Sequence, residues 1–335
     1  MARRRLRTAV RRADQRGYRR FWHGVGANFP SLTGAASTRF YLDNETRLLG
    51  EHLPGLQGDD AATRVGEAAM GGAEAGNRAG EPTAHGGEAA IRAGEAATRA
   101  DNSGPYRLLK TDLWDEAKNT RILQWAARQG ACVYGIDLSR PIVEQARDAF
   151  GDEPLRGAFG GEPLRAAFGG EPLRASLADV RELPFAGGSF DAIYSMGTIE
   201  HFAESESAVV EMARVLRPGG RLVLGVPNRH DPFLRPLLVV FLRAFGLYAY
   251  GSEKSYSRRA LRRMLEAAGL EVVAETGILF IPGWLRMLDL LAHTRLRPLE
   301  RITAPAVALF AWLDRRFPSL RRHGYLLASV AVRPR

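Results

Sequence analysis

Cysteine is almost absent from this sequence: Cys132 is the single one among 335 residues. One thiol cannot form a disulfide framework, a cysteine-based zinc site or a Cys-x-x-Cys redox pair, so the sequence excludes these three kinds of protein. A chain of this length buries a sizeable core without such cross-links.

Long apolar runs are absent as well. The longest apolar runs are 236–250, which Arg243 interrupts, and the shorter run 303–313. Both fall below the roughly 20 apolar residues of a membrane-spanning helix. The Arg-rich N-terminus lacks the apolar segment of a secretory signal. We therefore expect a cytoplasmic protein that touches a membrane at most peripherally.

Lysine is scarce, at three of the 47 basic residues, although the net charge is +10. Such a charge invites a nucleic-acid or anionic-membrane partner. Residues 1–20, however, hold nine arginines and one aspartate, and residues 286–335 hold ten arginines and three acidic residues. The segment 21–285 is therefore mildly acidic, and the arginine excess at the two ends favours a compositional bias over phosphate binding.

Low-complexity tracts divide the chain. Residues 58–104 repeat Gly-Glu-Ala-Ala among Ala, Gly, Arg and Glu, and too few apolar side chains are present to offset the entropy of ordering. We predict a disordered linker there, between a basic arm with a helical cap at 1–57 and a folded domain at 105–335. Within that domain, Glu-Pro-Leu-Arg recurs every nine residues over 151–173, which predicts a surface loop without functional role.

The folded domain alternates strand and helix patterns. Strands are predicted over 106–110, 132–136, before 177, and over 190–196, 221–226, 270–280 and 325–332; helices are predicted over 115–129, 141–150, 204–216 and 257–268. This alternation predicts an α/β fold with a doubly wound parallel sheet. In such a sheet ligands bind beyond the carboxyl ends of the strands.

Motifs follow these strands in a fixed order. They are Asp137, Ala178-Asp179, Leu183-Pro184-Phe185, Ser189-Phe190-Asp191, Glu200-His201, Glu211 and Val215-Leu216-Arg217-Pro218-Gly219-Gly220. Each is weak alone, but together, over 105–280 and the final strand, they resemble the class I S-adenosylmethionine-dependent methyltransferases of the small-molecule type 11 group. The resemblance implies a Rossmann-like methyltransferase sheet with an antiparallel edge strand at 325–332, plus helical additions.

The same resemblance implies the cofactor S-adenosyl-L-methionine and a role for each matching residue, with no metal. Asp137 would bind the ribose hydroxyls, and Leu138 would pack on the adenine face. Asp179 would bind the adenine amine, with Val180 beside it. Met196 and Gly197 would face the methionine portion.

The loop after the first strand departs from the family pattern. Lys110 stands where an acidic residue is expected, and residues 111–117 contain no glycine, so every position carries a Cβ. In one interpretation the loop is rebuilt and contacts the cofactor through Thr111, Asp112, Asp115 or Glu116. In the other, the site is degenerate and binds no cofactor. The acidic residues at 137 and 179 favour the first, unless they are merely exposed acids at strand ends.

His201 follows the fourth strand and is the candidate catalytic base, because imidazole titrates near neutrality. The alternative is that it opens the next helix and packs locally. Glu253 and Tyr256, before the last helix, either line the acceptor pocket or form a capping turn. Trp22 and Tyr41 either contact the cofactor or fasten the N-terminal cap to the sheet.

Two apolar helical insertions, at 231–256 and 282–322, are flanked by arginines. Such segments form either an interfacial helix or lid over an apolar substrate, or ordinary packing against the sheet. The sequence thus predicts methyl transfer to a small, lipophilic or lipid-linked acceptor, with peripheral membrane contact. The alternative is a catalytically degenerate binding module. A nucleic-acid acceptor is disfavoured, because residues 196–199 lack the Asn/Asp-Pro-Pro-aromatic motif of such enzymes.

Overall fold

The computed structural model describes residues 17–56, 104–152, 173–246, 248 and 250–335. The predictions for the basic arm, for the linker at 58–104 and for the repeat loop at 151–173 fall almost entirely on residues 1–16, 57–103 and 153–172, which lie outside the described residues.

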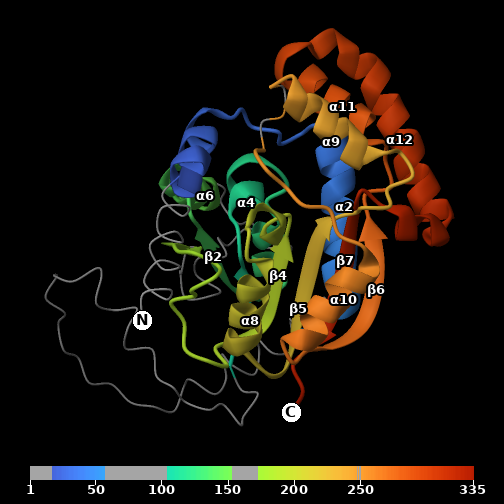
Figure 1. The fold of residues 1–335 in the computed structure, drawn as a ribbon. Coiled ribbons are helices and arrows are strands. Elements are labelled where there is room, and N and C mark those ends of the chain that lie inside the picture. The colour runs from blue at the N-terminus through green and yellow to red at the C-terminus, as the bar shows by residue number, and fades with distance from the viewer. Residues whose placement is uncertain (1–16, 57–103, 153–172, 247, 249) are drawn as a thin grey trace, which may run out of the picture.

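A seven-stranded sheet forms the centre of the described domain, in the order β3-β2-β1-β4-β5-β7-β6 (Figure 1). The strands are β1 (Arg107–Lys110), β2 (Cys132–Asp137), β3 (Arg174–Leu177), β4 (Phe190–Met196), β5 (Leu216–Pro227), β6 (Glu271–Ile278) and β7 (Leu326–Val332). Strands β1 to β5 pair in parallel. The chain winds outward from β1 to β3 and then returns to β4, so the winding direction reverses between β1 and β4. The predicted doubly wound sheet is confirmed.

The final strand differs in position from the expectation. It is antiparallel, as predicted, and pairs with both β5 and β6, so that β6 forms the edge of the sheet. The turn expected at Arg217–Gly220 belongs to β5. The Gly219 N–H donates to the Arg333 carbonyl at 2.8 Å, and the Arg333 N–H donates to the Gly220 carbonyl at 3.0 Å. These two bonds to Arg333, which directly follows β7, extend the pairing of β5 with β7 to the segment Arg217–Gly220.

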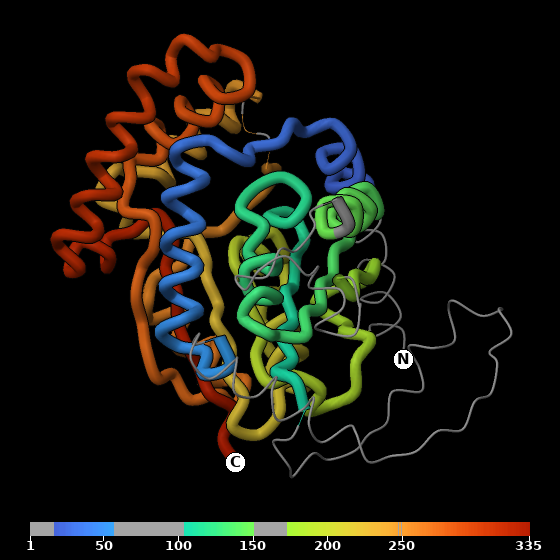
Figure 2. Tube along the Cα trace, turned by 180° about the vertical axis from the view of Figure 1, so that it is seen from behind, coloured from blue at the N-terminus to red at the C-terminus, as the bar shows by residue number. Residues whose placement is uncertain are grey.

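Helices cover both faces of the sheet, as Figures 1 and 2 show from opposite sides. Helices α2 (Ala36–His52), α5 (Ile122–Arg128) and α6 (Arg140–Asp152) share one apolar core, and α8 (Ser205–Val215) and α10 (Arg258–Ala267) share the other. Successive residues of β1 alternate between the two cores: Leu108 lies in the first and Leu109 in the second. Helix α10 begins as predicted, with the Ser257 hydroxyl accepting from the Ala260 N–H, and ends before Gly269.

The single helix predicted over 115–129 is wrong. The segment forms α4 (Trp114–Lys118) and α5, separated at Asn119–Arg121, where Arg121 adopts a left-handed conformation with φ of 58°. The Asn119 side chain donates to Asp115 Oδ1 at 2.8 Å and accepts from the Thr38 hydroxyl of α2 at 2.9 Å. These tertiary contacts override a helical propensity that is continuous along the sequence.

The two insertions form helices above the carboxyl ends of β5 and β6: α9 (Arg235–Ala244), α11 (Gly283–Arg295) and α12 (Glu300–Arg316) (Figure 1). Short 3₁₀ turns complete the chain: η1 (Pro54–Leu56), η2 (Ile199–His201), η3 (Arg297–Leu299) and η4 (Pro318–His323). The buried Asp289 carboxylate accepts from the Ser37 N–H at the start of α2 and from the Thr303 hydroxyl of α12. Within the described ranges, every helix is too short or too polar to span a bilayer.

Candidate active site

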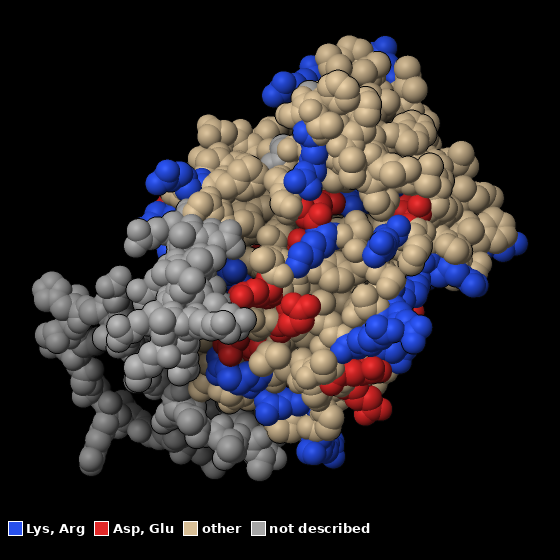
Figure 3. All heavy atoms as spheres, in the orientation of Figure 1, with Lys and Arg blue, Asp and Glu red and all other residues tan. Residues whose placement is uncertain are grey.

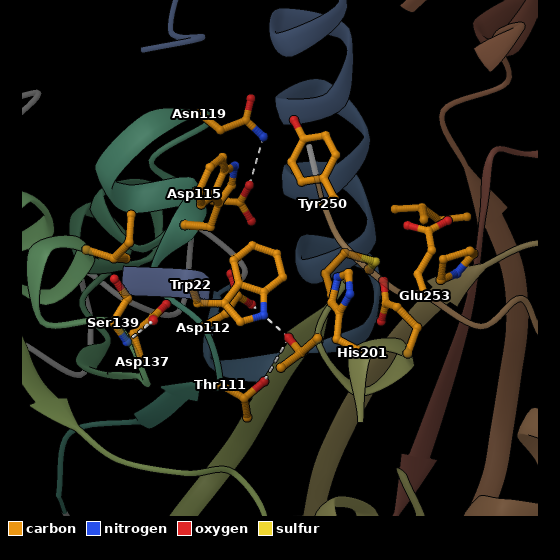
Figure 4. A pocket seen from close by; sticks show the side chains of 18 of the residues that line it. Trp22, Thr111, Asp112, Asp115, Asn119, Asp137, Ser139, His201, Tyr250 and Glu253 are labelled. Carbon is orange, nitrogen blue, oxygen red and sulfur yellow. Dashed lines mark hydrogen bonds between the residues drawn. The ribbon is translucent and has the colours of Figure 1, made fainter. Parts of the chain in front are cut away.

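A cavity of about 200 Å³ opens at the carboxyl ends of β1 to β5. Its walls include residues that directly follow β1, β2, β3 and β4, together with side chains from the N-terminal cap and from both insertions. It lies where the winding of the sheet reverses, between β1 and β4, which is the usual ligand site of a doubly wound sheet. In Figure 4, Asp137 and Ser139 lie toward one end of the cavity and His201 and Glu253 toward the other.

At the β2 end, Asp137 is held by two backbone donors. Its carboxylate accepts from the Leu113 N–H at 3.0 Å and from the Ser139 N–H at 2.7 Å. Burial raises the pKa of Asp137 to about 6, against the lowering effect of these two donors. The neighbouring Ser139 hydroxyl lines the cavity and has no hydrogen-bond partner among the described residues. The pair therefore offers an ionisable acceptor and a free hydroxyl to a polar ligand.

The glycine-free loop is built over Lys110, whose side chain is fully buried. The Lys110 ammonium lies 2.9 Å from Asp112 Oδ1 and 3.0 Å from Asp115 Oδ2. Burial alone would lower the Lys110 pKa, but the surrounding carboxylates hold it above its usual value. Lys110 therefore stays charged and draws both aspartates toward one point beneath the cavity wall.

Space for this loop comes from a glycine on the neighbouring strand. A Cβ at Gly135 of β2 would lie 2.3 Å from Leu113 Cδ2, closer than two carbon atoms can approach. The Leu113 side chain thus packs directly on the β2 backbone, while its N–H reaches Asp137. The absence of a side chain at Gly135 therefore leaves the space that Leu113 of the loop needs to pack against β2.

A chain of hydroxyl groups joins this loop to the end of β4. Thr198 donates to Asp112 Oδ2 at 3.0 Å, and Thr111 donates to the Ser195 hydroxyl at 2.7 Å. Between them, Gly197 adopts a φ of 72°, which favours glycine, and the Met196 side chain packs where a Cβ on Gly225 of β5 would clash. The loops after β1 and β4 thus form one hydrogen-bonded wall.

His201, at the end of η2, lines the opposite side of the cavity. Its Nδ1 lies 3.0 Å from the Ser252 carbonyl oxygen. Because a carbonyl only accepts, Nδ1 carries the proton and Nε2 is left as the acceptor nitrogen of the neutral ring. Burial lowers the His201 pKa below its usual value. The imidazole is therefore neutral at neutral pH and able to take up a proton.

Aromatic side chains form part of the cavity wall. The N-terminal helix at 17–28 places Trp22 edge-on against His201, with ring centres 4.9 Å apart, and the ring centres of Trp22 and Trp114 of α4 lie 6.2 Å apart. The ring centre of Tyr250 lies 5.9 Å from that of the same Trp114. Trp22 and Tyr41 both line the cavity, so each of them fastens the cap and also faces the ligand space.

Comparison with known proteins identifies this architecture. Residues 117–224 match the family model described as "Methyltransferase domain". Methyltransferase GfsG of Streptomyces halstedii is 40% identical over 101 residues, 30% of this chain and 31% of that protein. O-methyltransferase cnsE of Penicillium expansum is 29% identical over 156 residues, 46% and 49% of the two chains. The ubiquinone biosynthesis O-methyltransferase of Rhizobium etli (strain CIAT 652) is 29% identical over 150 residues, 43% and 60%.

The chain contains a class I S-adenosylmethionine-dependent methyltransferase domain. The chain aligns with between 31% and 60% of the length of these curated relatives. The cofactor of the methyltransferase domain is S-adenosylmethionine, as the resemblance implied.

Most of the predicted site residues line the cavity of the methyltransferase domain. They are Thr111, Asp112, Asp137, Leu138, Val180, Met196, Gly197 and His201. The structure brings these residues together from the ends of four strands, and their individual roles stay predictions.

Glu116 and Asp179 are not among the residues that line the cavity. Glu116 is fully buried and accepts from the Leu123 N–H at 3.0 Å, and burial raises its pKa to about 8. The Asp179 carboxylate is bound by Arg181, whose Nη2 lies 2.8 Å from Oδ2. To reach an adenine amine, Asp179 would have to leave this ion pair.

Of the two residues predicted to line the acceptor pocket, Glu253 and Tyr256, one lines the cavity and the other does not. Glu253 lines the cavity of the methyltransferase domain, whereas the Tyr256 hydroxyl lies 2.7 Å from the Ser205 hydroxyl and is not among the lining residues.

Sequence reasoning missed a group of lining residues from the cap, the insertions and the start of the final strand: Tyr18, Arg235, Tyr248, Arg286 and Tyr325. Only Arg235 carried a signal, since it is one of two arginines within the apolar stretch at 231–250.

Proposed function

We propose that this chain transfers a methyl group from S-adenosylmethionine to a small, lipophilic acceptor. The observation that carries the proposal is a single cavity that joins the Asp137 end of the methyltransferase domain to His201. Methyl transfer requires the donor and the acceptor to be aligned, and it requires little other chemistry from the protein.

The residues present fit the cofactor. The Asp137 carboxylate and the unpartnered Ser139 hydroxyl would hold the ribose. Gly197, whose φ is positive, has no side chain and so leaves room in the wall that would face the methionine portion. Thr111, Asp112, Leu138, Val180 and Met196 would complete the contacts. When bound, the cofactor supplies an electrophilic methyl group on a sulfonium.

His201 would act as the base for an acceptor with a weakly acidic proton. Its Nε2 is the accepting nitrogen, because Nδ1 donates to the Ser252 carbonyl. The lowered pKa keeps the ring unprotonated at neutral pH. Two of the relatives are named as O-methyltransferases, which supports an oxygen acceptor.

A lipophilic acceptor is supported by the insertion helices. Apolar side chains of α9, α11 and α12 are more than one-third exposed: Leu237, Val240, Phe241, Trp284, Leu288, Leu291, Ile302, Leu309 and Trp312. Figure 3 shows this part of the surface as largely tan, with basic side chains at intervals. Exposed apolar helices with arginines fit peripheral contact with an anionic membrane, from which such an acceptor would enter.

The test is S-adenosylhomocysteine release from S-adenosylmethionine in the presence of alkyl phenols, long-chain fatty acids and isoprenoid hydroquinones. We expect release above background with at least one class. His201→Gln should lower kcat about 10²-fold or more without changing cofactor affinity. The matched control His23→Gln, on an exposed residue of the cap helix, should leave kcat unchanged. Cofactor binding without release for every class would favour the binding module instead.

A further inference from the structure

Arg235 enters the cavity from the start of α9. Its residue is only 3% exposed, although a charged side chain is rarely buried without full pairing. The Asp231 carboxylate accepts from the Arg235 N–H at 3.2 Å, and Leu234 before it adopts a left-handed conformation with φ of 57°. The chain therefore turns sharply at this point and directs Arg235 inward, against the Tyr325 ring at 4.3 Å.

The guanidinium of Arg235 is only partly paired. Its Nη2 lies 2.7 Å from Glu253 Oε1, and the second oxygen of that carboxylate accepts from the Tyr248 hydroxyl at 2.5 Å. Arg235 Nε and Nη1 are buried and have no hydrogen-bond partner among the described residues. Buried donors that no protein group satisfies are rare, because their desolvation is not repaid.

A second guanidinium, that of Arg286 on α11, lies near the same Tyr325 ring. Arg286 lies 5.1 Å from the centre of the Tyr325 ring and 5.2 Å from that of Tyr41, and it forms no ion pair with the described residues. Both arginines line the cavity. Glu253 pairs with Arg235, whereas Arg286 forms no ion pair with the described residues, so its guanidinium is available to a ligand.

Helix α11 also provides an apolar wall. Met287 and Leu290 line the cavity beside Arg286, whereas Trp284, Leu288 and Leu291 of the same helix are exposed. The spacing places the first set on the inner face of the helix and the second on the outer face. A ligand held at Arg286 would therefore have apolar side chains next to it.

We propose that the methyl acceptor is an amphipathic anion whose carboxylate or phosphate group is bound by Arg235 and Arg286. This inference rests on the proposed function and names the substrate class of the same site. Arg235 Nε and Nη1 each retain an N–H that can donate to an oxygen of such a group, and Arg286 supplies a further positive charge. Asp137, the expected ribose ligand, ends β2, whereas the two arginines come from α9 and α11, so we assign the anion to the acceptor.

The experiment measures binding of three probes to the full chain saturated with S-adenosylhomocysteine: octanoate, octyl phosphate and the uncharged 1-octanol. We expect both anions to bind at least about tenfold more tightly than the alcohol. Comparison of octanoate with octyl phosphate distinguishes the two anionic groups.

Two variants should abolish this preference. Arg286→Met removes a charge without leaving a carboxylate unpaired. The double variant Arg235→Met with Glu253→Gln removes the guanidinium and its partner charge together, so that no buried ion is stranded. Arg301→Met, on an exposed arginine of α12, is the matched control and should keep the preference. S-adenosylhomocysteine should bind all of these proteins equally.

Equal or absent binding of the three probes to the wild-type chain would overturn the inference, and so would an anion preference that survives in both variants. A tenfold loss of S-adenosylhomocysteine affinity in Arg286→Met would also overturn it, because the arginine would then hold the cofactor. Failure of the wild-type chain to bind S-adenosylhomocysteine is a separate result, which contradicts the proposed function itself.

Discussion

Leu113 packs against Gly135 so closely that a Cβ on the glycine would lie 2.3 Å from Leu113 Cδ2. The loop after β1 has no glycine of its own, and this contact explains how it still approaches the sheet. The Leu113 N–H is thereby placed 3.0 Å from Asp137 Oδ2. The geometry of the loop and the orientation of the Asp137 carboxylate therefore depend on one glycine in the neighbouring strand.

Gly135→Ala should displace Leu113 and reduce S-adenosylhomocysteine affinity. Overpacking of this kind costs about 1–3 kcal/mol of stability, measured by chemical denaturation. Leu113→Ala in the same chain should restore much of the stability by removing the clash. Gly50→Ala, within α2 where a Cβ meets nothing within 4 Å, is the control and should raise stability by up to about 1 kcal/mol. A Gly135→Ala chain as stable as the wild type would refute the contact.

Lys110→Met should destabilise the fold at neutral pH by roughly 3–5 kcal/mol, because Asp112 and Asp115 would lose the cation between them. Burial already raises the Asp112 pKa, and Lys110 counteracts this effect. Without the lysine the folded-state pKa rises further above its unfolded value. The loss of stability should therefore grow as pH rises through that pKa and shrink on acidification. Urea unfolding at two pH values tests this, with the exposed Lys254→Met as control.

Cofactor affinity should depend on the ionisation of Asp137. Burial raises its pKa to about 6, so the carboxylate that we expect to accept from ribose hydroxyls is ionised above pH 6 and protonated below it. We expect the Kd for S-adenosylhomocysteine to rise by up to about tenfold per pH unit below that value. Asp137→Asn should flatten this profile and His201→Gln should preserve it. A pH profile that is flat in His201→Gln and unchanged in Asp137→Asn would show instead that His201 is the titrating group.

Membrane contact through the insertion helices predicts co-sedimentation with phosphatidylglycerol vesicles, weakened by salt, and little with phosphatidylcholine vesicles. Leu237→Ser with Phe241→Ser should lower binding at least about tenfold, because both side chains, 64% and 58% exposed, would contact the acyl region. Val210→Ser, at an exposed apolar residue of α8, is the control. Wild-type protein that stays in the supernatant with both vesicles would contradict this contact.

The sequence predicted the sheet well because buried strands and amphipathic helices carry local signals. The bounds of β4 at Phe190–Met196 and of α10, predicted over 257–268 and observed at Arg258–Ala267, are such cases. It could not predict the break at Asn119–Arg121, since that break depends on a hydrogen bond from Thr38, 81 residues away. Local patterns contain no information on such a contact.

The same limit applies to the candidate site. Residues that follow strands, such as Asp137 and Gly197, were found because strand ends converge at one edge of the sheet. Glu116 was expected to reach the cofactor from the loop after β1, but α4 directs it toward Leu123 of α5. Arg235 and Arg286 belong to insertions whose placement over the sheet has no counterpart in the sequence pattern.

The central claim is that the glycine-free loop and Asp137 together form a working S-adenosylmethionine site. Calorimetric titration of the full chain with S-adenosylhomocysteine tests it most directly. We predict saturable one-site binding that falls at least about tenfold in Asp137→Ala and is unchanged in Asp148→Ala, at an exposed position of α6. Absence of saturable binding, or equal binding by both variants, would contradict the account.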